Sequence, residues 1–415
     1  MSGGGPVAVI GAGPAGLAAA VELRRRGVAR VLVLERETEP AGIPRHAQHQ
    51  GFGLRDLRRP LSGPRYARRY AELATAAGAE LRTETMVTGW SPSGPLELTG
   101  PSGRETLEPA AVVLATGCRE RPRPARLVPG SRPDGVITTG ALQQLVYLKG
   151  LRPGTRALVV GAEHVSFSAL LTLAHGGART VGMVTELARH QSLALFRAGA
   201  ALRFRAPLWT CTALSAIHGR PRVEEVELTD LDSGAARRVA CDTVVFTADW
   251  IPDHELAVMA ALAMDAGTRG PTVDAALRTS RPGVFAAGNL LHGAETADVA
   301  ALGGRHAGAA AAAFVATGHG WPDARIPIEC EPPLRWIAPN AVVPGAGAPP
   351  RGRFALRSSD FFSRPRIAIA QGSRTLWVGR IARLVPGRSA SLPHSWTQAV
   401  DPSAEAVSVR VAAAG

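Results

Sequence analysis

Near its N-terminus the chain places two apolar runs on either side of a glycine turn and a helical stretch. Residues 7–10 are all apolar, and a glycine-rich turn and an Ala/Leu-rich stretch reaching Arg26 follow them. A second apolar run covers residues 31–34, after Gly27. Four-residue apolar runs bounded by turn residues are typical of buried strands, whereas Ala/Leu stretches favour helix. The pattern predicts a strand–helix–strand unit whose helix is closed by arginines and a glycine.

The same order recurs further along the chain. Residues 111–117 predict a buried strand with a glycine turn, and residues 157–166 predict a second strand, turn and helix. Residues 179–185 predict another strand, and residues 279–289 predict a strand and turn that lead into an Ala-rich helix over residues 295–315. Alternating strands and helices are typical of parallel α/β sheets.

The sequence pattern changes after Cys330. Residues 332–333 and 339–352 are rich in proline, glycine and alanine, and residues 366–370 and 375–379 contain alternating runs. Such runs, bounded by turn residues, are strand and hairpin signals. The end of the chain therefore predicts a β-rich appendage of roughly 80 residues.

Length and composition agree with a packed chain of several domains. Of the 415 residues, 46% are hydrophobic and 20% are charged, which excludes a disordered or fibrous protein. At about 150 residues per domain, the length predicts two to three domains.

Arginine carries almost all of the positive charge. The net charge is +13, and Lys149 is the only lysine. Arginine is dense in residues 55–69 and 119–126, but neither segment carries a recognised nucleic-acid motif, so we expect no nucleic-acid binding. Two interpretations stay open: a solvated basic face, or a docking surface for an acidic partner or substrate.

The four cysteines indicate neither a disulfide framework nor a metal site. They lie far apart, with no C-x-x-C pair. The apolar stretch over residues 7–21 lacks a basic segment before it and is broken by glycines, so it does not fit a signal peptide. The Ala-rich stretch 307–316 is too short to span a bilayer. We expect a cytoplasmic protein in a reduced compartment, with no transmembrane segment and no metal.

The first glycine turn carries a dinucleotide-binding pattern. Gly11, Gly13 and Gly16 form G-x-G-x-x-G directly after the first predicted strand, and Glu35 ends the second strand. The first glycine permits a tight turn, the second lets the backbone approach a pyrophosphate, and the third lets the helix pack against the strand. Glu35 would accept a hydrogen bond from a ribose hydroxyl.

With these motifs the chain resembles the two-dinucleotide-binding-domain flavoproteins, also called the pyridine nucleotide-disulfide oxidoreductase superfamily, over roughly residues 5–320. The resemblance implies an α/β fold: a Rossmann-like FAD domain with an inserted second Rossmann-like domain, followed here by the β-rich appendage. The expected FAD domain is discontinuous, over 1–120 and 243–325. The inserted NAD(P)-domain-like part is expected over 121–242, and the C-terminal β-rich domain over 326–415.

The resemblance also implies noncovalent FAD and a set of residues that hold it. The late motif of the family ends in aspartate, whereas this chain has Asn289, whose side-chain oxygen can still accept from a ribityl hydroxyl. The implied cofactor-binding residues are Gly11, Gly13, Pro14, Ala15, Gly16, Glu35, Arg36, Thr116, Gly117, Gly288 and Asn289.

The function that the resemblance implies is FAD-dependent oxidation or reduction. Residues 119–143 look like the branch that contains the flavoprotein subunits of amino-acid, opine and cyanide-forming glycine dehydrogenases. The leading hypothesis is a dehydrogenase that takes a hydride from a small amine, amino acid or hydroxy acid and passes electrons to a partner subunit or carrier. The alternatives are an NAD(P)H-dependent reductase of a small electron carrier, and a flavin-binding scaffold subunit.

The inserted domain departs most from the family pattern. Glu163 stands at the second glycine position and Ser166 at the third. A carboxylate about 4 Å from a diphosphate costs about 1 to 4 kcal/mol per charge pair, so we expect NAD(P) binding to be impaired. Gly161, His164 and Glu186 favour the other interpretation, a working NAD(H) site.

The segment after Glu35 occupies the place where the family's chain passes the flavin ring. It contains no cysteine, which excludes thiol–disulfide exchange there. Arg45 could hold a substrate carboxylate, and His46 or His49 could act as base; the alternative is a solvated surface loop.

Three further residues follow the predicted FAD turns. His292 and Glu295 either face the flavin or simply begin a helix. Cys118 has no partner cysteine nearby in sequence, so a buried inert thiol is expected.

Overall fold

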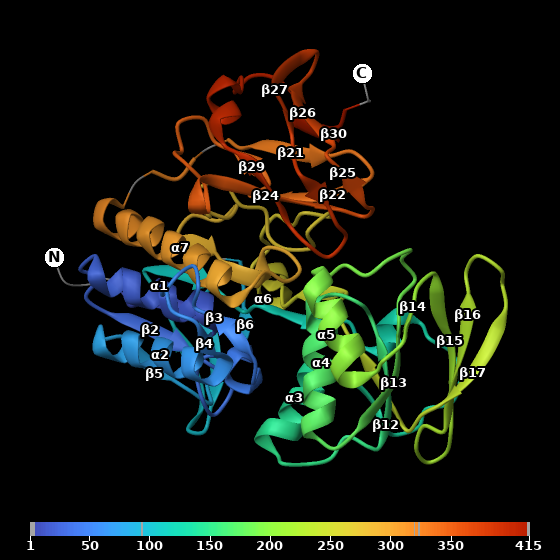
Figure 1. The fold of residues 1–415 in the computed structure, drawn as a ribbon. Helices are drawn as coiled ribbons and strands as arrows, with labels where there is room; N and C mark the ends of the chain where they lie inside the picture. The colour runs from blue at the N-terminus through green and yellow to red at the C-terminus, as the bar shows by residue number, and fades with distance from the viewer. Residues whose placement is uncertain (1–4, 93, 319, 323, 413–415) are drawn as a thin grey trace. The chain divides into compact units, whose positions relative to one another are not determined.

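The computed structural model describes residues 5–92, 94–318, 320–322 and 324–412 (Figure 1). The chain forms two compact units. The first unit is Met1–Arg45, Gln50–Cys118 and Ile251–Gly415, and the second is His46–His49 and Arg119–Trp250. The C-terminal β-rich region therefore clusters with the first unit.

A five-stranded parallel sheet forms the centre of the first unit. Val7 on β1 pairs with Val31 on one side and with Ala111 on the other, and all four residues of each of these three strands are buried. Strands buried on both faces are uniformly apolar rather than alternating, which is why the short runs identified them. The strand order is β20 (Val284–Ala286), β9 (Ala111–Leu114), β1 (Val7–Ile10), β2 (Val31–Leu34) and β5 (Glu80–Arg82).

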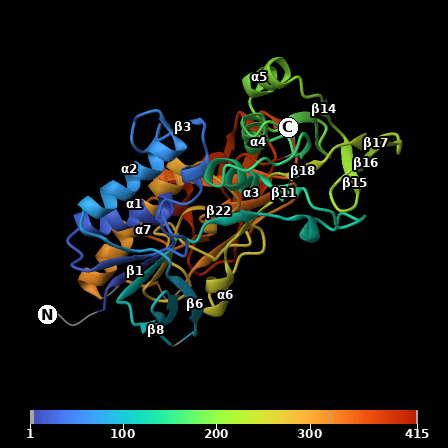
Figure 2. The same ribbon diagram turned by 90° about the horizontal axis from the view of Figure 1, so that it is seen from below.

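Three helices, α1 (Pro14–Arg25), α2 (Gly63–Ala76) and α7 (Ala297–Thr317), lie side by side in Figures 1 and 2. The contact between α1 and α7 is a backbone contact. A Cβ atom on Gly304 would lie 1.9 Å from the carbonyl oxygen of Ala15, and one on Gly308 would lie 2.6 Å from that of Ala19. Only glycine allows the two helices to approach this closely.

The remaining elements of the N-terminal part of the first unit are small. Residues between 50 and 107 form two small antiparallel sheets, one of three strands and one of two. The strands are β3 (Gln50–Phe52), β4 (Leu61–Ser62), β6 (Met86–Trp90), β7 (Leu96–Gly100) and β8 (Gly103–Leu107), and the short helix is α6 (Glu255–Met259).

The C-terminal region is β-rich, as predicted. Its core is built from residues such as Ile337, Phe354, Ile369 and Val409. One sheet has the order β23 (Ala341–Val342), β21 (Ile326–Cys330), β30 (Val407–Val411), β26 (Arg366–Gln371) and β27 (Arg374–Arg380). The other strands are β22 (Leu334–Ala338), β24 (Arg353–Ser358) and β29 (Ala390–Pro393) in one sheet, with β25 (Phe362–Ser363) and β28 (Arg383–Leu384) in a two-stranded one.

The second unit repeats the parallel α/β plan. Its sheet has the order β11 (Val136–Thr138), β18 (Thr243–Phe246), β12 (Arg156–Val160), β13 (Arg179–Val184) and β14 (Leu208–Trp209), all parallel. Its helices are α3 (Thr139–Gln143), α4 (His164–His175) and α5 (Ala194–Phe204), and β15 (Thr212–His218), β16 (Glu225–Asp230) and β17 (Ala236–Ala240) form an antiparallel sheet. Two short strands lie where the chain passes between the units, β10 (Cys118–Glu120) and β19 (Trp250–Pro252).

Two predicted elements differ from the observed ones. The strand expected from residue 279 covers only Val284–Ala286, because residues 281–284 form a turn in which the Val284 amide donates to the Arg281 carbonyl. The apolar stretch 307–316 is part of the longer helix α7, which by length and composition alone could cross a membrane. In this structure one face of α7, including Ala300, Gly304 and Ala311, is buried.

We expect Gly304→Val to destabilise the protein because the new side chain would overlap the Ala15 carbonyl and force α1 and α7 apart. The expected loss in free energy of unfolding is about 1–3 kcal/mol or more, measured by urea denaturation. Gly303→Ala is the matched control, since a Cβ there would meet only the Gly288 nitrogen at 3.8 Å. That variant should unfold within about 1 kcal/mol of the unmodified protein. Equal losses in both variants would contradict the packing argument.

Candidate functional site

The turn between β1 and α1 is shaped by glycines at two backbone contacts. Gly11 has φ +99°, and a Cβ atom on it would lie 2.5 Å from the Ala115 carbonyl oxygen. A Cβ atom on Gly16 would lie 1.8 Å from the Gly11 carbonyl oxygen. Neither position tolerates a side chain, so these two glycines hold the strand, the turn and the helix together.

Gly13 differs from Gly11 and Gly16, because a Cβ atom built on it would meet no atom of the described residues. No heavy atom of the described residues lies within 4 Å of a Cβ built there, and its φ of −73° is one that any residue adopts. Pro14 is the first helical residue, where its missing N–H costs no hydrogen bond, and the Ala15 amide belongs to the first turn, which has no intrahelical acceptor. The first turn of α1 contains no acidic residue. The space beside Gly13 therefore suits a negatively charged group.

Glu35 directly follows β2 beside this turn, and two backbone amides hold its carboxylate. Its Oε2 accepts from the Ala12 amide at 2.9 Å, and its Oε1 accepts from the Glu37 amide at 3.0 Å. Each carboxylate oxygen has a further lone pair, so Glu35 can still accept from a ribose hydroxyl.

Thr116 and Gly117 lie against a segment that the sequence did not mark. The Thr116 hydroxyl donates to the Asp253 carbonyl at 2.7 Å, and the Asp253 amide donates to the Gly117 carbonyl at 2.9 Å. The exposed Arg36 guanidinium lies 3.6 Å from the Asp253 carboxylate. Asp253 thus joins Arg36 to the Thr116–Gly117 turn. It follows β19 without a glycine motif, which is why no local pattern identified it.

The Gly288–Asn289 turn packs on the first turn of α1. Gly288 has φ +73°, and a Cβ there would lie 2.7 Å from the Ala15 Cβ. The Asn289 amide bridges the following loop: its Oδ1 accepts from the Glu295 amide at 2.9 Å and its Nδ2 donates to the Glu295 carbonyl at 3.3 Å. One lone pair of Oδ1 stays available to a cofactor hydroxyl.

The C-terminal region reaches this loop through Trp336 and Arg357. The buried His292 ring stacks on the Trp336 ring with centroids 4.5 Å apart. The Arg357 guanidinium lies 4.8 Å from the centroid of the Trp336 ring. Arg357 donates to the carbonyls of Gly293 at 2.8 Å and Ala294 at 3.3 Å. The C-terminal region therefore fixes the loop that follows Asn289.

Burial changes the titration of this cluster. It lowers the pKa of His292 to about 4, so the imidazole is neutral at pH 7. Burial also lowers the pKa of Arg357 to about 10, partly offset by Glu295 at 3.8 Å, so Arg357 stays cationic at neutral pH. Cys118 lies close enough to influence the same guanidinium. His292 and Glu295 were candidates from sequence, whereas Trp336 and Arg357 lie outside the family resemblance.

The catalytic candidates after Glu35 lie in different units. Arg45 belongs to the first unit and contacts Glu39, through the carbonyl at 2.5 Å and the carboxylate at 3.8 Å. His46 and His49 cluster with the second unit. His46 is buried, with Nδ1 3.3 Å from the Gln143 Oε1, and His49 is half-buried.

Glu163 fills the second glycine turn with its own carboxyl group. It caps α4: its Oε2 accepts from the Ala162 amide at 3.0 Å, and its own amide donates to the Ser166 hydroxyl at 3.2 Å. Gly161 has φ +138°, and a Cβ there would lie 2.8 Å from the Glu163 Oε2. The Ala162 amide, which would face a pyrophosphate in this turn, therefore already donates to the Glu163 carboxyl group.

Two buried carboxyl groups lie near each other at this end of the second unit. Burial raises the pKa of Glu163, and burial raises that of Glu120 to about 7, with Glu163 adding to the Glu120 shift. Glu120 Oε2 accepts from the Gly140 amide at 2.7 Å. Glu186 and His164 were two of the residues that favoured a working NAD(H) site. Glu186 is exposed, and the His164 ring packs edge-on against the Phe196 ring with centroids 5.4 Å apart.

The described residues contain no cluster of side chains suited to disulfide or metal chemistry. None of Cys118, Cys211, Cys241 and Cys330 forms a disulfide; Cys241 is buried and the other three are half-buried. Within the described residues, no group of three His, Cys, Asp or Glu side chains could hold a metal ion.

A family model for pyridine nucleotide-disulphide oxidoreductases matches residues 5–304. The chain belongs to this family. An opine oxidase subunit of Agrobacterium tumefaciens is 36% identical over 167 residues, which cover 37% of this chain and 31% of that protein. Thioredoxin reductase of Treponema pallidum is 28% identical over 294 residues, covering 68% of this chain and 88% of that protein. The chain thus spans about a third of the first relative's length.

Solved structures of this family share the fold. Thioredoxin reductase from T. acidophilum superimposes with a TM-score of 0.61 at 20% identity, covering 76% of this chain and 99% of that one. This confirms the predicted pair of Rossmann-like domains, with the β-rich region beyond them. As a pyridine nucleotide-disulphide oxidoreductase, the chain is an FAD-dependent oxidoreductase, and the open position beside Gly13 fits the FAD diphosphate.

We expect Gly13→Val to give a folded but colourless protein. The valine side chain would enter the open space without strain and exclude the diphosphate. Flavin absorbance per chain after purification measures the loss, and circular dichroism checks the fold. Gly199→Val is the matched control, because a Cβ there also meets nothing within 4 Å and the position lies on α5 in the second unit. A yellow Gly13→Val protein would place the diphosphate elsewhere.

Glu120 should make stability depend on pH. Its pKa is raised in the folded state, so the folded protein binds a proton that the unfolded chain releases between about pH 4.5 and 7. Stability therefore falls as pH rises through this window, by about 1–3 kcal/mol, and stays lowered above it. Glu120→Gln should flatten this part of the pH profile in urea denaturation. The exposed Glu329→Gln is the control and should leave the slope unchanged; an unaltered slope in Glu120→Gln would refute the assignment.

Proposed function

We propose that this chain is an FAD-dependent dehydrogenase that takes a hydride from a small amine, amino acid or hydroxy acid and passes the electrons to a partner. The observation that carries the proposal is the Glu163 carboxyl group in the second glycine turn. It opposes nicotinamide binding by occupying the turn and, in its ionised form, by charge. The segment after Glu35 contains no cysteine for a thiol route, and in this proposal an organic donor supplies the electrons.

In this proposal the chain's own residues hold the reactants rather than react. Bound FAD supplies the chemistry by accepting a hydride, while the donor loses that hydride and a proton to become an imine or a carbonyl compound. The Glu39 carboxylate contacts Arg45 at only 3.8 Å and is exposed, so a substrate carboxylate can replace it. His46 or His49 would take the donor's proton.

The partner is proposed by analogy with a relative. The opine oxidase relative is, by its name, one subunit of a larger enzyme. A partner chain would receive the electrons from this one.

A reductase of a small electron carrier is the second candidate. The observation that favours it is the relation to thioredoxin reductase, of which the matched segment covers 88%. In that case electrons would enter from NAD(P)H and leave to the carrier. A flavin-binding scaffold subunit is the third possibility, in which neither donor class reduces the flavin without a second chain.

Anaerobic flavin reduction by a panel of donors separates these functions. We expect small amines, amino acids or hydroxy acids to bleach the flavin band quickly, and NADH and NADPH to do so slowly or not at all. Glu163→Gly should strengthen NADH binding by roughly tenfold or more, since 1.4 kcal/mol corresponds to one decade. Glu163→Gln keeps the size and removes the charge, so it separates repulsion from steric exclusion.

Fast reduction of the unmodified protein by micromolar NADH, with no effect of Glu163→Gly, would overturn the dehydrogenase and establish the reductase. If no donor reduces the flavin until a second chain is added, the scaffold function would replace both.

A further inference from the structure

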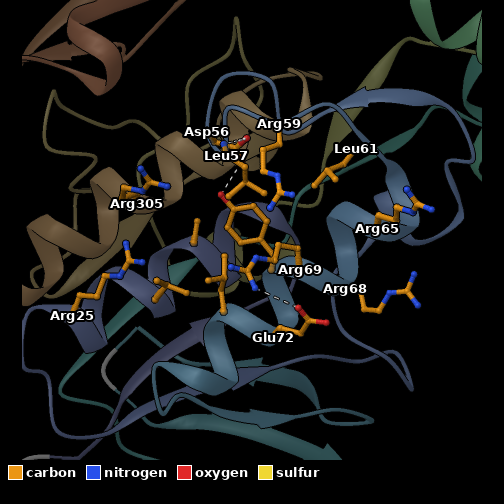
Figure 3. Close-up of a pocket in the computed structure, with 14 residues that line it drawn as sticks. Arg25, Asp56, Leu57, Arg59, Leu61, Arg65, Arg68, Arg69, Glu72 and Arg305 are labelled. Carbon is orange, nitrogen blue, oxygen red and sulfur yellow. Dashed lines mark hydrogen bonds and ion pairs between the residues drawn. The ribbon is translucent and has the colours of Figure 1, made fainter.

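The arginine-dense residues 55–69 line part of a cavity of about 530 Å3 in the first unit. Its walls come from α1, α2, α7, the loop over residues 56–60 and the start of β4. Figure 3 shows Arg59 and Arg69 between Arg25 and Arg305 on one side and Arg65 and Arg68 on the other. All six arginines line the same cavity.

The positive charge of this cavity is not neutralised within the protein. Only two carboxylates line it, Asp56 and Glu72, so six cations and two anions leave a net charge of +4. Glu72 pairs with Arg69 at 3.5 Å, and both side chains are exposed. Throughout the described part of the chain, no carboxylate pairs with the other five lining arginines. Like charges gathered in one cavity disfavour its empty state and attract an anion.

Both carboxylate oxygens of Asp56 accept hydrogen bonds, which join the loop to α2. Its Oδ2 accepts from the hydroxyls of Tyr66 at 2.6 Å and Tyr70 at 2.7 Å, and its Oδ1 accepts from the Leu57 amide. The adjacent Arg55 pairs with the buried Asp298 of α7 at 3.0 Å. The arginine-bearing loop is thus anchored at two points, which lowers the entropic cost of ordering it around a ligand.

The cavity also has an apolar lining. Val21, Leu57, Leu61 and Leu73 contribute to it, together with the buried Tyr70 ring. Cavities of about 300–1,000 Å3 with apolar walls and a few charged groups are typical of small-molecule sites. Guanidinium groups bind phosphate oxygens bidentately.

We propose that this cavity binds a small organic molecule carrying two or more phosphate groups. The arginines would hold the phosphates, and the apolar lining would hold the organic part. A protein partner with an acidic surface would instead need a broad face of about 800 Å2, whereas the six arginines here line one cavity of about 530 Å3. The proposal does not depend on the direction of electron flow at the flavin.

This site is separate from the FAD turn. Ala18, Val21 and Arg25 of the lining lie 5, 8 and 12 residues after Gly13 on α1, which corresponds to about 8, 12 and 18 Å at 1.5 Å per residue. The FAD diphosphate at the start of the helix and a ligand in the cavity can therefore be bound at once.

The test uses the FAD-loaded protein and ATP without Mg2+ as the probe, in 150 mM NaCl, by isothermal titration calorimetry. We expect one ATP per chain beyond FAD, and at least tenfold weaker binding in Arg59→Gln/Arg305→Gln. The matched control Arg104→Gln/Arg366→Gln removes the same charge from exposed positions of the first unit and should change the Kd less than twofold. Inorganic triphosphate should bind more weakly than ATP, because it lacks an organic part. Flavin absorbance confirms that both variants stay folded and loaded.

Three results would overturn the proposal. Equal weakening in both double variants would show general attraction to a basic protein. A ten-residue glutamate peptide that binds more tightly than ATP, and is weakened by the cavity variant, would establish an acidic partner instead. No ATP binding at millimolar concentration would exclude the site. Should the double variant lose its flavin, Arg68→Gln alone replaces it, with the same tenfold criterion.

Discussion

The architecture of the first unit depends on contacts between backbones at the first turn of α1, where no Cβ atom intervenes. Gly11 approaches the Ala115 carbonyl, Gly16 approaches Gly11, and Gly304 of α7 approaches the Ala15 carbonyl. These contacts bring the turn after β1, the turn after β9 and the helix α7 to one place. Each turn carries residues that we expect to hold FAD, and the glycines keep these contacts free of side chains.

The two units share one local backbone geometry but differ in the group that lies at the start of the helix. Both have a parallel strand, a glycine with positive φ and a helix that starts beside it. In the first unit Gly13 leaves the helix start open to an anion, whereas in the second Glu163 occupies that place with a carboxyl group. Burial of this carboxyl raises its pKa.

The C-terminal region contributes charge as well as structure. Arg357 is a buried cation whose cost of desolvation is offset by two carbonyl oxygens, by Glu295 and by the Trp336 ring. It therefore fixes the loop between Asn289 and α7 and places a positive charge beside it. Burial lowers the pKa of His292 to about 4, so the imidazole stacked on Trp336 is neutral at pH 7. A region outside the family match thus shapes the surroundings of a family motif.

The sequence alone determined the elements whose signal is local. The strands at residues 7–10 and 31–34 were predicted with their observed ends, and the helix between them ends one residue before the predicted Arg26. The glycine spacing indicated the FAD turn, because steric demands on neighbouring residues appear directly in the sequence. Asp253, Trp336 and Arg357 carry no such signal, since they contact residues far away in the chain. The arginines of residues 55–69 left two interpretations open, and only packing against α1 and α7 made them the wall of a cavity. Contacts between distant segments depend on how whole elements pack, and no local pattern of residues encodes that.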